Sequence, residues 1–159
     1  MSKAKAVLHP VTVTASKSGD GTIGFHGSSP VWDGSEAHFA FHKDHHGMKK
    51  HDYHLIEFVL DDDTGEGLRF PSAPHEAMWV AKVENADHPV CPDGETASDY
   101  SVIDPICVCD GGKRLIVRND NPREEHFSFT LNFIKGDERA GSGQGVCWDP
   151  IIKNGNGGL

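Results

Sequence analysis

The chain has 159 residues, about the usual length of one domain, and a hydrophobic content of 36% is enough to fill a single core. Its formal net charge of −9 at pH 7 repels phosphate backbones and anionic membrane surfaces, which argues against nucleic-acid and membrane partners. No apolar run is long enough for a secretion signal or a transmembrane helix, so we expect a cytoplasmic protein.

The first quarter of the chain predicts three short strands. Alternating apolar and polar residues mark strands at 7–14, 22–26 and 38–42, with a turn at 18–21 between the first two. Eighteen glycines and nine prolines fall in clusters between such runs, as is typical of turns between many short strands.

The middle of the chain predicts a hairpin followed by another strand. The apolar run 53–60 ends at the acidic turn 61–67, and residues 68–70 are expected to return along it. Residues 77–83 indicate a further strand or a helical turn. Residues 84–101, which contain three widely spaced turn formers, predict a long surface excursion.

The last third contains the clearest strand of the sequence. Phe127, Phe129, Leu131 and Phe133 recur at every second position, which places them on one face of a strand and leaves the polar residues between them towards water or a neighbouring strand. Residues 113–118 and the turn 119–122 predict a hairpin with this strand. Residues 146–148 suggest a short closing strand, and 154–159 a flexible Gly/Asn-rich tail.

These patterns together predict an all-β protein, 1–159, that folds as one antiparallel β-sandwich of about eight short strands. A closed β-barrel is the alternative, because short strands with frequent turns are common to both architectures.

The segment 38–54 has the greatest potential for binding chemistry because it is rich in histidine. Imidazole is a common ligand of zinc, copper and nickel, so a divalent transition metal is the expected cofactor if one is bound. Asp44 or Asp52 would orient a ligand ring. Lys43, Lys49 and Lys50 oppose cation binding, so a solvated polar loop is the alternative. The candidate ligands are His38, His42, His45, His46, His51 and His54.

The four cysteines, Cys91, Cys107, Cys109 and Cys147, are expected to be free thiols in a reducing cytosol. Cys107 and Cys109 are two residues apart. On a strand they would project to one face with Cα atoms about 7 Å apart, which is awkward for a mutual disulfide but acceptable for two metal ligands. Small buried groups within an apolar strand are the other interpretation.

The sequence does not predict an enzyme. Ser72 or Cys91 can be paired on paper with His75 or His88, but no nucleophile elbow surrounds any serine, and proximity in sequence says little about proximity in the fold. We therefore predict no catalytic residue.

Three motifs of the C-terminal third resemble a known family. They lie at residues 115–121, 126–133 and 148–154. Together they resemble small bacterial proteins of the DP-EP family, and the ending Trp148-Asp149-Pro150-Ile151-Ile152 is similar to that of the AidA and PixA type of inclusion-body proteins. The resemblance implies a compact cytoplasmic β-sandwich without an established catalytic role and, in the inclusion-body proteins, ordered assembly.

We therefore expect a non-enzymatic cytoplasmic protein that acts through self-assembly, as a homo-oligomer, or through binding a protein partner. Edge strands of a sandwich carry unpaired backbone groups, and the strand at 125–134 has few lysines or prolines to prevent pairing if it lies at an edge. A metal-binding module that uses residues 38–54 is the alternative.

Overall fold

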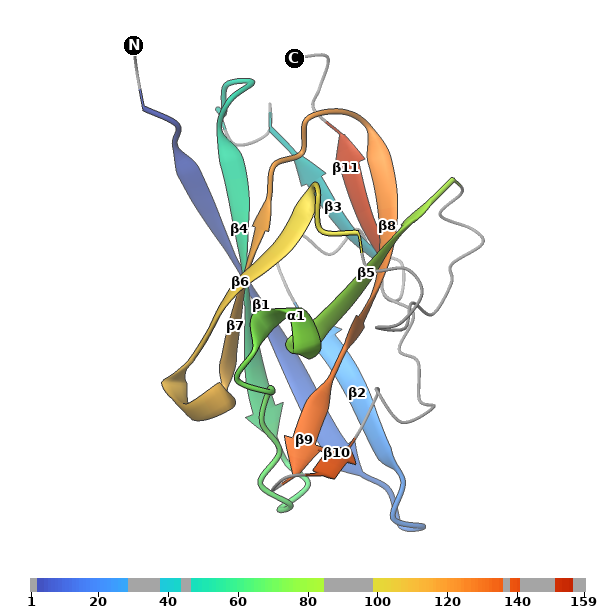
Figure 1. Ribbon diagram of the computed structural model, residues 1–159. Coiled ribbons are helices and arrows are strands. Elements are labelled where there is room, and N and C mark those ends of the chain that lie inside the picture. The colour runs from blue at the N-terminus through green and yellow to red at the C-terminus, as the bar shows by residue number, and fades with distance from the viewer. Residues whose placement is uncertain are drawn as a thin grey trace.

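The computed structural model describes residues 3–28, 38–43, 47–84, 99–135, 138–140 and 151–155. Two β-sheets pack against each other, which confirms the predicted all-β sandwich (Figure 1). Neither sheet closes into a barrel. The α-helix α1 (Pro74–Ala77) is a single turn, and among the described residues no helix is long and apolar enough to cross a membrane.

The larger sheet has five strands in the spatial order β2, β1, β4, β7, β6. β1 and β4 run parallel in unbroken register from Ala6↔Tyr53 to Ala15↔Asp62, whereas the other neighbours are antiparallel. The prediction of antiparallel sheets is therefore wrong for this pair, because the chain returns to β4 only after crossing to the other layer. The strands are β1 (Ala6–Lys17), β2 (Ile23–Ser28), β4 (Tyr53–Asp62), β6 (Ile103–Cys109) and β7 (Arg114–Asn119).

The smaller sheet has four strands in the order β3, β11, β8, β5, and β3 runs parallel to β11. A separate two-stranded sheet, β9 with β10, follows β8. A single 3-10 turn, η2 (Asp110–Gly112), joins β6 to β7. The strands of these sheets are β3 (His38–His42), β5 (Met78–Val83), β8 (Glu125–Leu131), β9 (Phe133–Lys135), β10 (Glu138–Ala140) and β11 (Ile151–Gly155).

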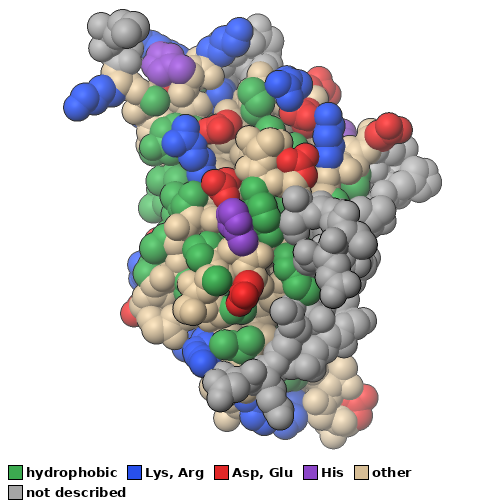
Figure 2. All heavy atoms as spheres, viewed as in Figure 1, with side chains coloured by type: hydrophobic (Ala, Val, Ile, Leu, Met, Phe, Trp, Pro, Cys, Tyr) green, Lys and Arg blue, Asp and Glu red, His purple; other side chains and the backbone are tan. Residues whose placement is uncertain are grey.

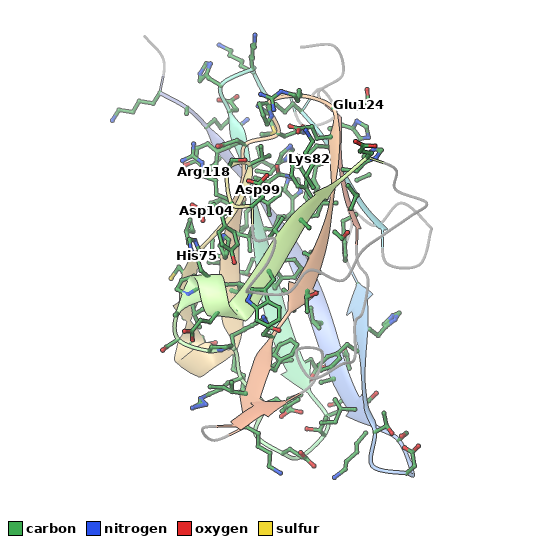
Figure 3. All side chains as sticks on the ribbon, turned by 45° about the vertical axis from the view of Figure 1, so that its right-hand side comes forward. His75, Lys82, Asp99, Asp104, Arg118 and Glu124 are labelled. Carbon is green, nitrogen blue, oxygen red and sulfur yellow. The ribbon has the colours of Figure 1, made fainter. Side chains whose placement is uncertain are left out.

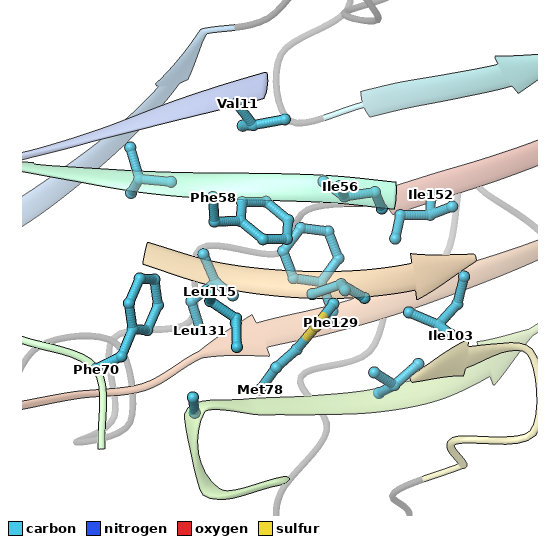
Figure 4. Close-up of a cluster of buried hydrophobic side chains, with 14 of the residues drawn as sticks. Val11, Ile56, Phe58, Phe70, Met78, Ile103, Leu115, Phe129, Leu131 and Ile152 are labelled. Carbon is cyan, nitrogen blue, oxygen red and sulfur yellow. The ribbon is translucent and has the colours of Figure 1, made fainter. Parts of the chain in front are cut away.

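The predicted phenylalanine strand forms the centre of the core (Figure 4). Phe127, Phe129, Leu131 and Phe133 are all buried, as predicted. The ring of Phe129 lies 5.5 Å from that of Phe58 on β4, so β8 connects the two sheets through aromatic contacts. The polar residues between them are also buried, because β8 is a central strand flanked by β11 and β5.

The hairpins predicted at residues 53–70 and 113–134 are both wrong in their pairing. Residues 68–70 do not return along β4. Leu68 and Phe70 enter the core, and Arg69 forms an isolated bridge with Ile134. The turn 119–122 connects β7 to β8, which belong to different sheets. The turns lie where the sequence predicts them, but a turn does not determine whether the next strand stays in the same layer.

The C-terminal prediction needs one correction. Asn154 and Gly155 are not part of a tail but the end of β11, and Asn154 is buried between the sheets. Residues 156–159 and the predicted closing strand 146–148 lie outside the described residues, as does most of the predicted excursion at 84–101.

Candidate functional site

The N-terminal half of β1 forms an edge of the larger sheet. On one side β1 pairs with β4 along Ala6–Ala15, but on the other side β2 reaches only from Thr12 to Lys17. Among the described residues, no strand pairs with the outer side of residues 6–11. Figure 1 shows this half of β1 at the margin of the sandwich, with β4 on its inner side.

Hydrogen bonds near both ends of β1 show which backbone groups face this margin. Lys5 O accepts a hydrogen bond from Tyr53 N at 3.0 Å, and Ala15 O accepts one from Asp63 N at 2.8 Å. Odd-numbered residues of β1 therefore direct their backbone groups towards β4, and even-numbered residues direct theirs to the opposite side. We call the outward backbone groups of Ala6, Leu8 and Pro10 the β1 edge.

The β1 edge carries an exposed hydrophobic side chain. Leu8 is 52% exposed and Ile106 is 48% exposed, and they are the exposed large hydrophobic residues of the described chain. Ile106 lies on β6, the opposite edge of the same sheet, where Pro105 and a register shift between Pro105 and Cys107 oppose further pairing. At the β1 edge, only Pro10 opposes the pairing of a further strand. Proline has no backbone N–H, so the edge lacks one outward hydrogen-bond donor at this position.

A buried histidine pair lies directly beneath the β1 edge. His9 and His54 occupy core-facing positions of β1 and β4, and His9 Nε2 lies 2.8 Å from His54 Nδ1. His54 Nε2 lies 3.2 Å from Asn121 Nδ2. Within the pair, one imidazole nitrogen donates to the other.

Three asparagines continue this polar cluster across the two sheets. Asn119 on β7 and Asn154 on β11 exchange two amide hydrogen bonds, each of 2.8 Å. Asn121 Nδ2 donates to Gly155 O on β11 at 3.0 Å and to Phe41 O on β3 at 3.2 Å. The backbone of Asn121 has φ +43°, a left-handed conformation that asparagine tolerates well. The cluster therefore fixes the two layers at this end of the sandwich.

Two charged side chains secure the loop between β3 and β4. The buried Lys43 Nζ donates to Lys50 O at 2.7 Å, and burial lowers the pKa of Lys43 while the charges of Asp120 and Asp52 oppose the shift. Asp52 accepts hydrogen bonds from Lys49 N at 2.7 Å and Lys5 N at 2.8 Å, and these two bonds lower its pKa. The start of β1 is thereby tied to the start of β4.

The structure separates several of the predicted metal ligands. His54 is buried and bonded to His9, His51 is exposed beside Asp52 at 3.7 Å, and half-buried His42 packs against Gly155. His38 is the first residue of β3, but its side chain is outside the described atoms, as are His45, His46 and Asp44 entirely. Within the part of the chain that is described, no three His, Cys, Asp or Glu side chains converge on one ion position. Metal binding by the whole segment stays a prediction.

Sequence reasoning missed His9, Asn119, Asn121 and Asn154. A signal was present for His9, since it takes an inward position in the alternation of residues 7–13. No comparable signal marks the asparagines, whose partners lie on strands that are distant in sequence.

A second histidine–carboxylate pair lies on the outer surface near α1 (Figure 3). His75 Nε2 is 2.8 Å from Asp104 Oδ1, and its ring stacks on Tyr100 at a centroid distance of 4.0 Å. Tyr100 Oη donates to Met78 O at 2.8 Å. Ring nitrogen Nε2 of His75 is thus bonded to a carboxylate. These contacts fasten α1 to β6.

The surface around the N-terminal end of the sandwich carries charges of both signs. Figure 2 shows Lys and Arg side chains at this end, and Lys5, Lys49 and Lys50 are exposed.

No protein-family model matches the chain, and neither does any curated protein.

Proposed function

We propose that the protein self-associates by pairing the β1 edge with the β1 edge of a second copy. The observation that carries this proposal is the backbone direction of β1, which turns the N–H and C=O groups of Ala6 and Leu8 away from β4. Such groups add a strand readily, because every new backbone hydrogen bond replaces a bond to water and excludes water from the neighbouring side chains.

Charge favours an antiparallel arrangement of the two copies. In a parallel pair, Lys3 and Lys5 of one copy would lie beside the same residues of the other. In an antiparallel pair centred on Leu8, which sets outward residues opposite outward residues, the lysines lie at opposite ends of the paired segment. Six strand residues separate them by about 20 Å, which exceeds the screening length of about 8 Å at physiological salt.

The phenylalanine strand does not take part in this proposal. β8 lies between β11 and β5, so its backbone is already paired on both sides. Assembly through this strand would require an edge position, which β8 does not have. The β1 edge takes its place.

A reducing, cytoplasmic compartment in a bacterial cell is part of the proposal. It is supported by the free thiols of Cys107 and Cys109 and by the resemblance of the C-terminal third to the DP-EP family and to the inclusion-body proteins. Self-assembly is the property that the inclusion-body resemblance implies.

Sedimentation velocity over a range of concentrations tests the proposal. A six-residue edge is a small contact, so we expect association at roughly micromolar concentrations or above. Leu8→Lys places a charge at the new interface and is expected to shift the dimerisation midpoint at least tenfold upward. Because the Leu8 side chain is exposed, the thermal unfolding of the variant should match that of the wild type.

Ile106→Lys is the matched control, since it makes the same change at the opposite edge of the same sheet. It should leave association unchanged. A wild-type chain that is monomeric at several hundred micromolar overturns the proposal, and so does an assembly that Ile106→Lys dissociates and Leu8→Lys does not.

A further inference from the structure

Cys107 and Cys109 lie side by side on β6, at the edge of the larger sheet. Both are free thiols, with Cys107 exposed and Cys109 partly buried. Val108 between them packs against the core, so the two thiols lie on the outer face of the strand. They follow directly after the register shift at Pro105, where a strand bends and twists more strongly.

The two side chains interact with each other. Burial raises the pKa of Cys109, and the neighbouring Cys107 raises it further. The thiol of Cys109 is therefore protonated at neutral pH and is a poor nucleophile. A disulfide is disfavoured as well, because Cα atoms about 7 Å apart lie at the limit of what one bridge spans.

Arg114 supplies a positive charge next to this pair. It is the direct cross-strand partner of Cys109 on β7, and its charge acts on the Cys109 thiol in the direction that favours the thiolate. The guanidinium also lies 3.6 Å from Glu57 and 3.5 Å from Asp110, which hold it beside the thiols.

A surface cavity of about 370 Å³ opens beside Cys109. Arg69, Phe70 and Gly112 line its other side. Gly112 has no room for a side chain, because a Cβ would come within 2.7 Å of Arg69 Cβ. The cavity gives a small metal complex access to Cys109 from solvent, and Cys107 is itself exposed.

We propose that Cys107 and Cys109 bind one monovalent copper ion as a two-thiolate site. Thiolates are soft ligands, and soft ligands select Cu(I). Two sulfurs on opposite sides of one ion need a separation of roughly 4–5 Å, twice a metal–sulfur bond of about 2.3 Å. Side chains two residues apart on one face of a strand reach this separation by rotation about χ1.

Among the described residues, two thiolates suit Cu(I) better than zinc. A structural zinc site has four protein ligands, and no third His, Cys, Asp or Glu converges on the thiols within the described residues. On binding, Cu(I) forms two S–Cu bonds, both thiols lose their protons to solvent, and the metal is neither oxidised nor reduced. The resulting complex carries one negative charge, which Arg114 favours and Asp110 opposes.

Competition with a chromophoric Cu(I) chelator, under anaerobic and reducing conditions, tests the site. We expect one Cu(I) per chain in the wild type and in the Cys91→Ser/Cys147→Ser double variant. Cys107→Ser and Cys109→Ser should each weaken binding at least a hundredfold while their thermal unfolding stays close to that of the wild type. Arg114→Gln should weaken binding about threefold to tenfold, and Arg114→Lys should restore most of it.

A pH series provides the second readout. Because two thiol protons leave, affinity should rise by up to about a hundredfold per pH unit below the thiol pKa values. The proposal is overturned if Cu(I) binding survives both single substitutions, if it requires Cys91 or Cys147, or if Zn²⁺ displaces Cu(I) from the pair at equal concentration.

Discussion

His9 Nε2 and His54 Nδ1 lie 2.8 Å apart in the interior of the sandwich, although 45 positions separate the two residues in the sequence. The bond joins the core-facing sides of β1 and β4 beneath the β1 edge, where Phe41 packs against both rings at centroid distances of 5.3 and 5.2 Å. The pair is the innermost part of a polar network that extends through Asn121 to the other sheet.

Removal of His54 should destabilise the fold strongly. His54→Ala leaves His9 Nε2 without its partner and opens a cavity, so the free energy of unfolding in urea is expected to fall by about 3 kcal/mol. His51→Ala, at an exposed position three residues earlier, should change it by less than about 0.5 kcal/mol. Equal losses in the two variants would show that the buried pair contributes nothing specific.

Asp52 should contribute to acid unfolding. Hydrogen bonds from Lys49 N and Lys5 N lower its folded pKa below the ordinary value of 3.8, so the unfolded chain takes up this proton at a higher pH. Its stabilisation is present above that ordinary value and is lost as pH falls through the folded pKa. We expect Asp52→Asn to be less stable at pH 7 and to lose less stability on acidification. An acid-unfolding curve parallel to that of the wild type contradicts this, and Asp61→Asn serves as the exposed control.

Lys43 should make the stability of the fold depend on pH in the alkaline range. Burial lowers its folded pKa below the ordinary 10.5, against the charges of Asp120 and Asp52, so the unfolded chain binds this proton more tightly. Stability then rises as pH increases towards 10.5. The wild-type urea midpoint should increase relative to that of Lys43→Met as pH rises towards 10.5. The pH dependence of the urea midpoint should be the same in Lys49→Met, at an exposed position, as in the wild type. If Lys43→Met also has the wild-type pH dependence, Lys43 is not its source.

The turn beside the cavity permits a matched glycine test. Gly111 and Gly112 both have positive φ, at 64° and 87°, but only Gly112 lacks space, since a Cβ there would lie 2.7 Å from Arg69 Cβ and 3.0 Å from Phe70 O. Gly111→Ala should cost about 1 kcal/mol. Gly112→Ala should cost about 2–4 kcal/mol, because strain and overlap add. Similar losses measured by thermal unfolding would argue against the close packing.

Local patterns predicted the strands because strand alternation is a property of neighbouring residues. Phe127, Phe129 and Leu131 are buried as their spacing indicated, and the third strand at 38–42 coincides with β3. The same patterns could not predict pairing. Nothing in residues 6–15 or 53–62 encodes that these strands lie parallel and adjacent, since their register depends on contacts formed across the whole fold.

The candidate sites depend on this non-local information. The β1 edge exists only because β2 reaches no further than Thr12, and the histidine pair exists only because His9 and His54 face each other across parallel strands. The thiol pair could be placed on one strand from its spacing alone. The position of Arg114 beside this pair could not be predicted, because the cross-strand register of β6 with β7 includes a shift at Pro105.

Amide hydrogen exchange of Leu8, followed by NMR at increasing protein concentration, tests the central claim most directly. The Leu8 N–H faces away from β4, so it should exchange rapidly in the dilute monomer and become protected as a second β1 edge pairs with it. The amides of Val7 and His9 face β4 and should stay protected at every concentration. A Leu8 amide whose exchange rate does not change with concentration would contradict assembly through this edge.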